Sequence, residues 1–230
     1  MVVSPQMLRS AYHTRYELIE FATYMLAART QGLVGLHAAC VGHAGDGILL
    51  LGPSGSGKST VALHCLLQGF DFLSEDSVLM SRETMLATGV ANFLHLRADA
   101  LRWLARTREA TRVRRSPVIR RRSGVKKFEL DLRLGEYRLA RSPLKIAATV
   151  FLSAQRVGDR PQLRALPKAE FRARLTASQP YAANQPHWRR FCASLSSIAA
   201  FELTRGTHPL DTVDVLRTLV GFPAARRRVK

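Results

Sequence analysis

The segment HAACVGHAGDGILLLGPSGSGKSTVALHCLLQGFDFLSEDSV, residues 37–78, determines the fold that we predict. Its centre, GPSGSGKS at 52–59, matches the phosphate-binding pattern G-x-x-x-x-G-K-[ST] at every fixed position. The apolar run at 48–51 before it lacks alternation, which predicts a strand buried on both faces. A helix is predicted at 58–68, with Gly69 placed to end it. A strand, a glycine-rich turn and a helix in this order are the context in which the pattern binds nucleotide phosphates.

The residue types of the turn suit this chemistry. Glycines let the backbone turn tightly and bring its N–H groups to phosphate oxygens, and the helix that follows directs the positive end of its dipole at them. Lys58 is expected to contact the β- and γ-phosphates, and the Ser59 hydroxyl to bind Mg²⁺. The predicted cofactors are Mg²⁺ and a nucleotide, which we take to be ATP, although the pattern leaves GTP or pyrophosphate open as the donor. The predicted nucleotide-binding residues are Gly52, Pro53, Ser54, Gly55, Ser56, Gly57, Lys58, Ser59 and Thr60.

The acidic residues after the helix indicate which reaction follows binding. The apolar strand predicted at 145–153 ends without the acid that common ATPases and GTPases place there. Instead, Glu75 and Asp76 end a short strand directly after the phosphate-binding helix. A carboxylate beside the γ-phosphate can bind Mg²⁺ or accept the proton of an attacking hydroxyl. The alternative is that both are surface acids in a turn.

The remaining pattern predicts one α/β domain with a mixed central sheet. A helical N-terminal segment, 1–32, precedes a main domain at 33–222 and a basic tail at 223–230. Residues 43–47 suit a β-hairpin with a longer loop. Strands are expected at 33–41, 70–76, 77–83, 93–97, 127–133, 145–153 and 199–206, and helices at 16–32, 98–106, 167–178, 188–198 and 209–222.

The net charge of +18 is unevenly distributed and concentrates in residues 107–127, which we predict to be a mobile basic loop. Contact with phosphate or with an acidic peptide is the first interpretation. Nucleic acid is less favoured, because Trp103 is the one aromatic residue within the basic span 102–127 and stacking platforms are missing. A solvated basic face is the structural alternative.

Cysteine usage and hydropathy suggest the compartment. Cys40, Cys65 and Cys192 are odd in number and lack metal-ligand spacing, so buried free thiols are expected. There is no signal-peptide pattern, and the most apolar run is too short to span a bilayer. A cytoplasmic protein without a membrane partner is therefore predicted, and a homo-oligomer is left open.

Together, His37, the glycine-rich turn, Gly69 and the SED sequence at 74–76 resemble the catalytic half of the bacterial HPr kinase/phosphorylase family, whose P-loop is of the phosphoenolpyruvate-carboxykinase-like type. The spacing fits without gaps from His37 to Asp76. The resemblance implies that His37 is the active-site histidine near the transferred phosphate and that Asp76 accepts the substrate serine's proton. It also implies that Glu75 replaces the first aspartate of the family's pair, and we assign it to the Mg²⁺ site.

The resemblance further implies what the whole chain does. Residues 33–222 would form a short HPr-kinase-like domain that phosphorylates a peptide or protein, such as a phosphocarrier or a precursor peptide of a ribosomally made natural product. The sequence lacks the family's E-x-R-G signature, so reversible phosphorylase activity is not expected. Lys126, Lys127 and Arg141 are candidate contacts to substrate or phosphate. Two alternatives stay open: a kinase or carboxykinase-like enzyme acting on a small molecule, and a nucleotide-binding regulatory protein without transfer activity.

Overall fold

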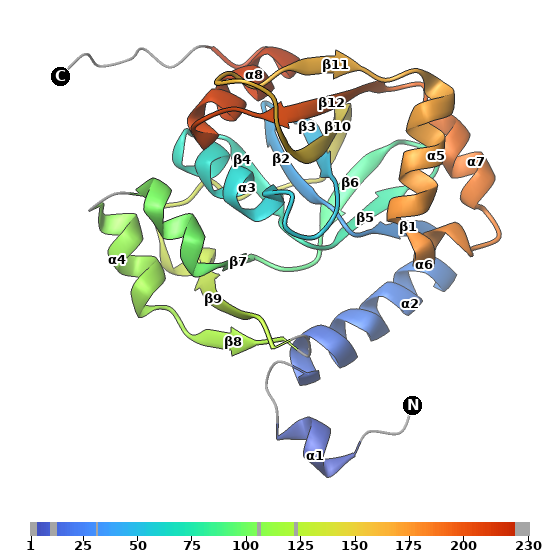
Figure 1. Cartoon of the computed structure of the whole chain (residues 1–230). Coiled ribbons are helices and arrows are strands. Elements are labelled where there is room, and N and C mark those ends of the chain that lie inside the picture. The colour runs from blue at the N-terminus through green and yellow to red at the C-terminus, as the bar shows by residue number, and fades with distance from the viewer. Residues whose placement is uncertain (1–3, 10–12, 31, 105–106, 122–123, 224–230) are drawn as a thin grey trace.

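The apolar run before the glycine-rich turn forms strand β3 (Asp46–Leu51) in a computed structural model of the chain (Figure 1). The structure describes residues 4–9, 13–30, 32–104, 107–121 and 124–223. Ile48 and Leu50 pack into one core cluster, Leu49 and Leu51 pack into a second, and all four are fully buried. The predicted strand with two buried faces is therefore confirmed.

In the part of the chain that the structure describes, nine strands form a mixed sheet. β10 (Leu144–Arg156) lies parallel to β3 and to β12 (Ala199–Arg205), and the other pairs are antiparallel. The order is β1–β5–β6–β10–β3–β2–β4, with β12 beside β10 and β11 beside β12. The remaining strands are β1 (Leu33–Leu36), β2 (Ala39–His43), β4 (Asp71–Ser74), β5 (Val78–Ser81), β6 (Leu86–Gly89) and β11 (Leu163–Ala165). The α/β class with a mixed central sheet is confirmed.

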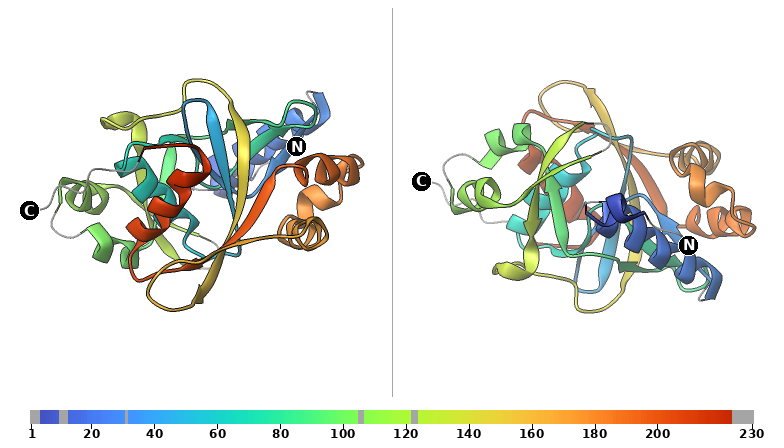
Figure 2. Two further views of the ribbon diagram at one scale, coloured as in Figure 1. Left: turned by 90° about the horizontal axis from the view of Figure 1, so that it is seen from above. Right: turned by 90° about the horizontal axis from the view of Figure 1, so that it is seen from below.

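Helices cover both faces of this sheet (Figure 2). α3 (Lys58–Leu67) and α8 (Pro209–Leu219) bury Leu63 and Leu216 in the cluster that holds Ile48. On the other face, α5 (Lys168–Ser178), α6 (Pro180–Ala183) and α7 (Trp188–Leu195) pack against Leu49 and Leu51. The two layers of helices hold the sheet between them. The C-terminal end of β3 leads into the glycine-rich turn, which connects the sheet to α3.

The N-terminal segment forms helices, as predicted for residues 16–32. α1 (Pro5–Leu8) comes first, then a π-helical stretch η1 (His13–Ile19) leads into α2 (Glu20–Thr30), which packs against β1. The boundaries at residues 32 and 222 stay predictions, and residues 224–230 of the basic tail lie outside the described residues.

The single strand predicted at 33–41 is wrong, because the chain forms two strands there. β1 pairs with β5, whereas β2 pairs with β3 and β4, so the two belong to different regions of the sheet. His37 lies at the break between them, and its side chain is 48% exposed. The break frees this side chain from the sheet and leaves it available to a site.

The hairpin that follows is tighter than predicted. His43 pairs directly with Asp46, which leaves a two-residue turn in place of a longer loop. Ala44 and Gly45 both have positive φ, 51° and 91°. Positive φ at both positions is the geometry that matches the twist of a two-residue β-hairpin.

The mobile loop predicted at 107–127 is also wrong for the residues described there. Thr107 caps helix α4 (Arg108–Arg115), which buries Ala110 and Val113 on one face. β8 (Val118–Arg120) then pairs with β9 (Lys126–Asp131), and β7 (Phe93–Leu96) completes a second sheet. The arginines of α4 occupy its other faces, so the high charge concealed a short amphipathic helix. Residues 122–123 lie outside the described residues.

Most other elements agree with their predictions in position, with differences in detail. The helix predicted at 98–106 is a 3₁₀ helix, η2 (Ala98–Leu104), and a short 3₁₀ turn, η3 (Leu132–Leu134), ends the strand predicted at 127–133. Gly69, with φ 87°, follows the end of α3 as predicted. The strands β6, β8 and β11 and the helix α6 were not predicted, because segments of three or four residues carry little periodicity.

The three cysteines are free and buried, as predicted. Cys40 and Cys65 are fully buried and Cys192 nearly so. In the described ranges, we find no helix with the length and apolar character needed to cross a membrane.

Candidate active site

The glycine-rich turn between β3 and α3 forms the floor of the site. Gly52, Gly55 and Gly57 have φ of 137°, 82° and 98°, a region that other residues rarely adopt. A Cβ on Gly52 would also lie 2.7 Å from the carbonyl oxygen of Leu152 on β10. Glycine is thus required at 52 both by conformation and by the close approach of the neighbouring strand.

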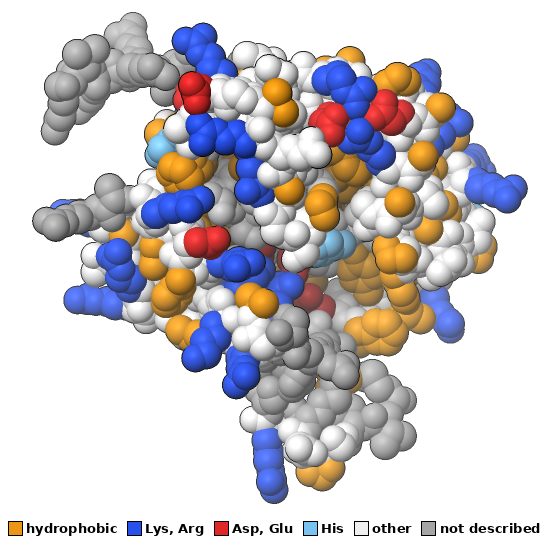
Figure 3. Space-filling model, in the orientation of Figure 1, with side chains coloured by type: hydrophobic (Ala, Val, Ile, Leu, Met, Phe, Trp, Pro, Cys, Tyr) orange, Lys and Arg blue, Asp and Glu red, His pale blue; other side chains and the backbone are white. Residues whose placement is uncertain are grey.

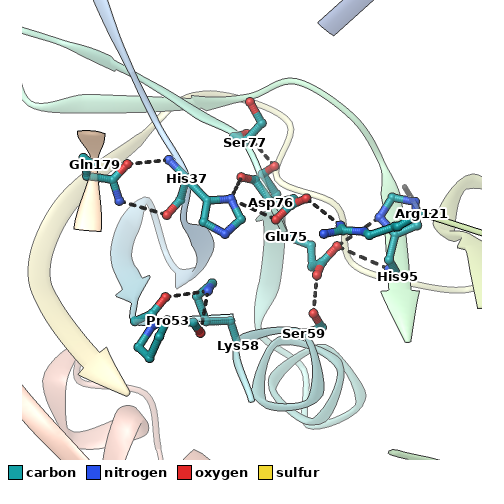
Figure 4. A network of polar contacts seen from close by, with 12 residues as sticks. His37, Pro53, Lys58, Ser59, Glu75, Asp76, Ser77, His95, Arg121 and Gln179 are labelled. Carbon is teal, nitrogen blue, oxygen red and sulfur yellow. Dashed lines mark hydrogen bonds and ion pairs between the residues drawn. The ribbon is translucent and has the colours of Figure 1, made fainter. Parts of the chain in front are cut away.

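Lys58 begins α3 and folds back over the turn (Figure 4). Its Nζ donates to the carbonyl oxygens of Gly52 at 2.7 Å and Pro53 at 3.3 Å. Burial lowers the pKa of Lys58, while the charges of Asp76 and Glu75 oppose this shift. The ammonium group therefore lies against the carbonyl oxygens that begin the turn, at the N-terminal end of α3.

Arg205 of β12 braces the same turn from the neighbouring strand. Its guanidinium donates to the carbonyl oxygen of Ser56 at 3.2 Å and also to that of Gly55. These hydrogen bonds keep the carbonyl groups of Ser56 and Gly55 directed at the Arg205 guanidinium. Nothing local in the sequence marks Arg205 for this contact, because residues 55 and 205 meet only through the sheet.

Ser59 and Glu75 contact each other directly. The Ser59 hydroxyl donates to one oxygen of the Glu75 carboxylate, which is 3% exposed. Mg²⁺ in phosphotransfer sites is bound by one or two protein oxygens together with substrate phosphates and water. A hydroxyl and a carboxylate in contact fit this donor set. Among the described residues, no group of three histidine, cysteine or acidic side chains forms a self-sufficient metal site.

His95 of β7 holds the other oxygen of Glu75. Its backbone N–H donates to this oxygen at 3.3 Å, and its Nδ1 lies 3.2 Å from the same atom. On its far side, Nε2 of His95 is 3.5 Å from Glu129 of β9, an ion-pair distance that is long for a hydrogen bond. The sequence pattern FLHL at 93–96 predicts only a core strand, so this histidine was missed.

Glu129 links this group to the N-terminal helices. Its carboxylate accepts hydrogen bonds from Arg15 and from the Tyr16 hydroxyl, both at 2.6 Å. Burial acts to raise the pKa of Glu129, but its contacts with His95 and Tyr16 outweigh it and hold the pKa at about 2. Burial likewise acts to lower the pKa of His95, and its contacts with Glu129 and Glu75 raise that pKa to about 9. His95 is therefore a cation between two carboxylates at neutral pH.

Asp76 lies beside this chain and contacts two side chains that the sequence separates widely. One carboxylate oxygen is 3.0 Å from Nδ1 of His37, and the other accepts a hydrogen bond from Arg121 at 3.0 Å. Burial acts to raise the pKa of Asp76, but the hydrogen bond from His37 and the charges of His37 and Arg121 hold it well below its usual range. Asp76 is thus ionised and directed into the site (Figure 4).

His37 is fixed through its backbone. Gln179, between α5 and α6, accepts from the His37 N–H at 2.8 Å and donates to the His37 carbonyl oxygen at 3.0 Å. The ring Nδ1 also lies 3.1 Å from the Asp76 carbonyl oxygen, so it faces two acceptors and carries the proton. The amide clamp therefore orients His37 toward Asp76.

A cavity of about 580 Å³ lies over the turn and joins these groups. This volume suits a bound nucleotide, since small-molecule sites span roughly 300–1,000 Å³. Its lining carries several cations, as a polyphosphate requires, and three carboxylates: Lys58, Arg97, Arg102, Arg121, Lys127, Arg156 and Arg205, with Glu75, Asp76 and Asp99.

Most of the residues predicted for the site lie at this cavity. Ser54 to Thr60, His37, Glu75, Asp76 and Lys127 line it, while Gly52 and Pro53 lie behind Lys58. Burial among other cations lowers the pKa of Lys127. Lys126 and Arg141 are exposed and are not part of the lining. The structure adds His95, Arg121, Glu129, Gln179 and Arg205 to the network.

Comparison with known proteins gives a distant structural similarity and no sequence match. One similar solved structure is the HPr(Ser) kinase/phosphatase from Coxiella burnetii, with a TM-score of 0.38 and 11% identity. The similarity covers 80% of this chain and 88% of that chain. No protein-family model matches the sequence, and no curated protein matches it.

Proposed function

We propose that this protein is an ATP-dependent kinase that transfers the γ-phosphoryl group of ATP·Mg to a hydroxyl of a peptide or protein. One observation carries the proposal: Asp76, Lys58 and the Ser59–Glu75 pair, whose residue types suit a base, a phosphate contact and a metal site, line one cavity. The sequence resemblance described above, which rests in part on the same residues, favours the same assignment.

Each group has a role that follows from its position. Lys58 and the N–H groups of the turn bind the phosphates, and Arg121 and Lys127 supply positive charge where negative charge develops. Ser59 and Glu75 would hold Mg²⁺, which would supply positive charge to the phosphates when bound. His37 and Arg121 orient the Asp76 carboxylate.

The chemical step is a displacement at phosphorus. The acceptor hydroxyl oxygen forms a bond to the γ-phosphorus while the bond from that phosphorus to the β–γ bridging oxygen breaks, and ADP leaves. The hydroxyl proton passes to Asp76, which returns it to water. A positioned base of this kind contributes typically about 10²–10⁴-fold to the rate.

Lys58→Ala tests the proposal with a matched control. Loss of the ammonium group should abolish transfer and weaken ATP·Mg binding, because its charge is removed from the β- and γ-phosphates. Binding is measured with a fluorescent ATP analogue, and transfer with radiolabelled ATP and a library of serine-containing peptides. Lys168→Ala makes the same charge change at an exposed position of α5 and should behave like the unaltered protein.

Two results would contradict the proposal. Unchanged turnover in Lys58→Ala would show that the glycine-rich turn is not the working site. Tight ATP·Mg binding with no transfer to any peptide, and with transfer to small hydroxyl compounds or to none, would favour a small-molecule kinase or a regulatory protein instead.

A further inference from the structure

A second cavity, of about 550 Å³, lies on the other side of His37, between α2 and the turn from α5 to α6. We call it the aromatic groove, because rings from η1, α2 and α6 line it: Tyr16, Phe21, Tyr24 and Tyr181. Phe21 and Tyr181 are 48% and 44% exposed, with their ring centres 6.3 Å apart. Hydrophobic side chains gather around a hollow beside α2 and α6 (Figure 3). Rings held open to solvent at a concave site are suited to contact a ligand.

The two cavities differ in charge, and this difference identifies two kinds of ligand. The cavity over the glycine-rich turn, to which the proposed function assigns the nucleotide, is rich in lysine and arginine. The lining of the aromatic groove includes neither residue. Its charged member is Glu20, whose pKa is raised to about 7 by burial and by the nearby charge of Asp76. A site of this composition disfavours phosphate and favours an apolar group.

His37 lines both cavities, so the aromatic groove lies next to the reacting centre, with this side chain between them. In phosphoryl transfer the attacking and leaving oxygens lie roughly in line, so the acceptor approaches from the side opposite ADP. The base must lie on the acceptor's side. Because the Asp76 carboxylate contacts His37, an acceptor placed for this base lies next to the aromatic groove.

We propose that the aromatic groove is the acceptor site, and that it binds an aromatic or large aliphatic side chain of a peptide next to the phosphorylated residue. This inference rests on the proposed function above. Tyr181 closes the groove from α6, and its hydroxyl donates to the sulfur of Met25 on α2, so the ring spans the two walls. Gln179 lines the groove and clamps His37, which couples the groove to the orientation of the histidine.

The probes are two small serine peptides, N-acetyl-Ser-Phe-amide and N-acetyl-Ser-Ala-amide, titrated into the full chain to tens of millimolar and followed by NMR. Burying a large apolar side chain raises the affinity of a complex by about tenfold or more. The Ser-Phe peptide should therefore bind at least about fivefold more tightly than the Ser-Ala peptide. Tyr181→Ala should remove this preference. Tyr181→Phe keeps the ring and should retain it, as should Leu134→Ala at an exposed position outside both cavities.

The outcomes separate this inference from the proposed function. If ATP·Mg binds and Lys58→Ala abolishes transfer, but the two peptides bind alike or Tyr181→Ala changes nothing, the acceptor-site inference fails alone. If the Phe preference depends on Tyr181 and ATP·Mg does not bind, the proposed function fails. Sedimentation equilibrium tests whether a second copy of the chain occupies the groove. A dimer that Tyr181→Ala dissociates would assign the groove to that copy and overturn the inference. Phe21→Ala repeats the test from the opposite wall, in case Tyr181→Ala fails to fold.

Discussion

Asp76 contacts a histidine and an arginine through different oxygens of one carboxylate, which keeps it ionised and fixes its direction. Asp76→Asn should therefore retain ATP·Mg binding while transfer falls by about 10²–10⁴-fold, because the amide cannot accept the hydroxyl proton. Transfer rates at saturating ATP, with binding measured separately, check this. Glu75→Gln is the informative comparison, since its first effect should be weaker binding of Mg²⁺. A larger loss of transfer in Glu75→Gln at saturating Mg²⁺ would mean that the two acids have been assigned the wrong way round.

His64 on α3 provides a pH-dependent effect on stability that is separate from the site. Burial, together with the charge of His208, lowers the pKa of His64 to about 4. Its ordinary pKa is 6.5, so the unfolded chain takes up a proton at higher pH than the folded chain does. The free energy of unfolding that the neutral His64 side chain contributes is fully present above pH 6.5 and is lost as pH falls toward 4. The loss between pH 7.5 and pH 5 is about 2 kcal/mol.

His64→Leu isolates this effect. The variant should lose less free energy of unfolding than the unaltered protein does over the same pH range, as measured by urea denaturation. His187→Leu makes the same change at an exposed position before α7 and should leave the pH dependence unchanged. Identical pH profiles for His64→Leu and the unaltered protein would show that His64 is not kept neutral by burial.

At the scale of the element, the hairpin of β8 and β9 places neighbouring basic residues in different surroundings. Arg121, just after β8, contacts Asp76 and lines the cavity over the glycine-rich turn. Its neighbour Arg120 is exposed and is not part of that lining. Arg121→Gln should lower the maximal transfer rate by about tenfold or more, because a cation at the reacting centre is lost.

Arg120→Gln is the matched control, since it makes the same change one residue away. Its effect should be below about twofold and should vanish at high salt, because exposed charges are screened over about 8 Å at physiological ionic strength. Steady-state kinetics at two salt concentrations compare the two variants. Equal effects of both changes would mean that the run acts only as a diffuse basic surface.

At the scale of the whole molecule, the three cysteines report how well both core layers are closed. Cys65 lies in the cluster under α3 and α8, whereas Cys40 and Cys192 lie in the cluster under α5 and α7. Burial raises the pKa of all three thiols. Because the thiolate is the reactive form, an aromatic disulfide reagent should modify them at least about 100-fold more slowly in the native protein than in urea. Rapid modification of Cys192 alone would show that the layer of α5 to α7 opens locally.

What could be predicted from the sequence is what depends on local chemistry. The strand at 48–51, the glycine-rich turn and the helix after it follow from an apolar run, from glycines with positive φ and from helical spacing, all within some twenty residues. Asp76 and Glu75 could be found because they follow this unit closely. The mixed sheet followed from the order of the elements. The basic segment was misjudged, since α4 buries only two apolar side chains among many arginines.

The tertiary structure alone decided which distant side chains meet at the site. His37 was named from a resemblance, but its release from the sheet depends on β1 and β2 pairing with different neighbours. His95 resembles a core histidine in sequence, and only the position of β7 beside Glu75 makes it a contact of the site. Arg205 reaches the glycine-rich turn across 149 residues of chain. Contacts of this range depend on strand order and register, which no short stretch of sequence encodes, because each strand's partner is chosen by the packing of the whole sheet.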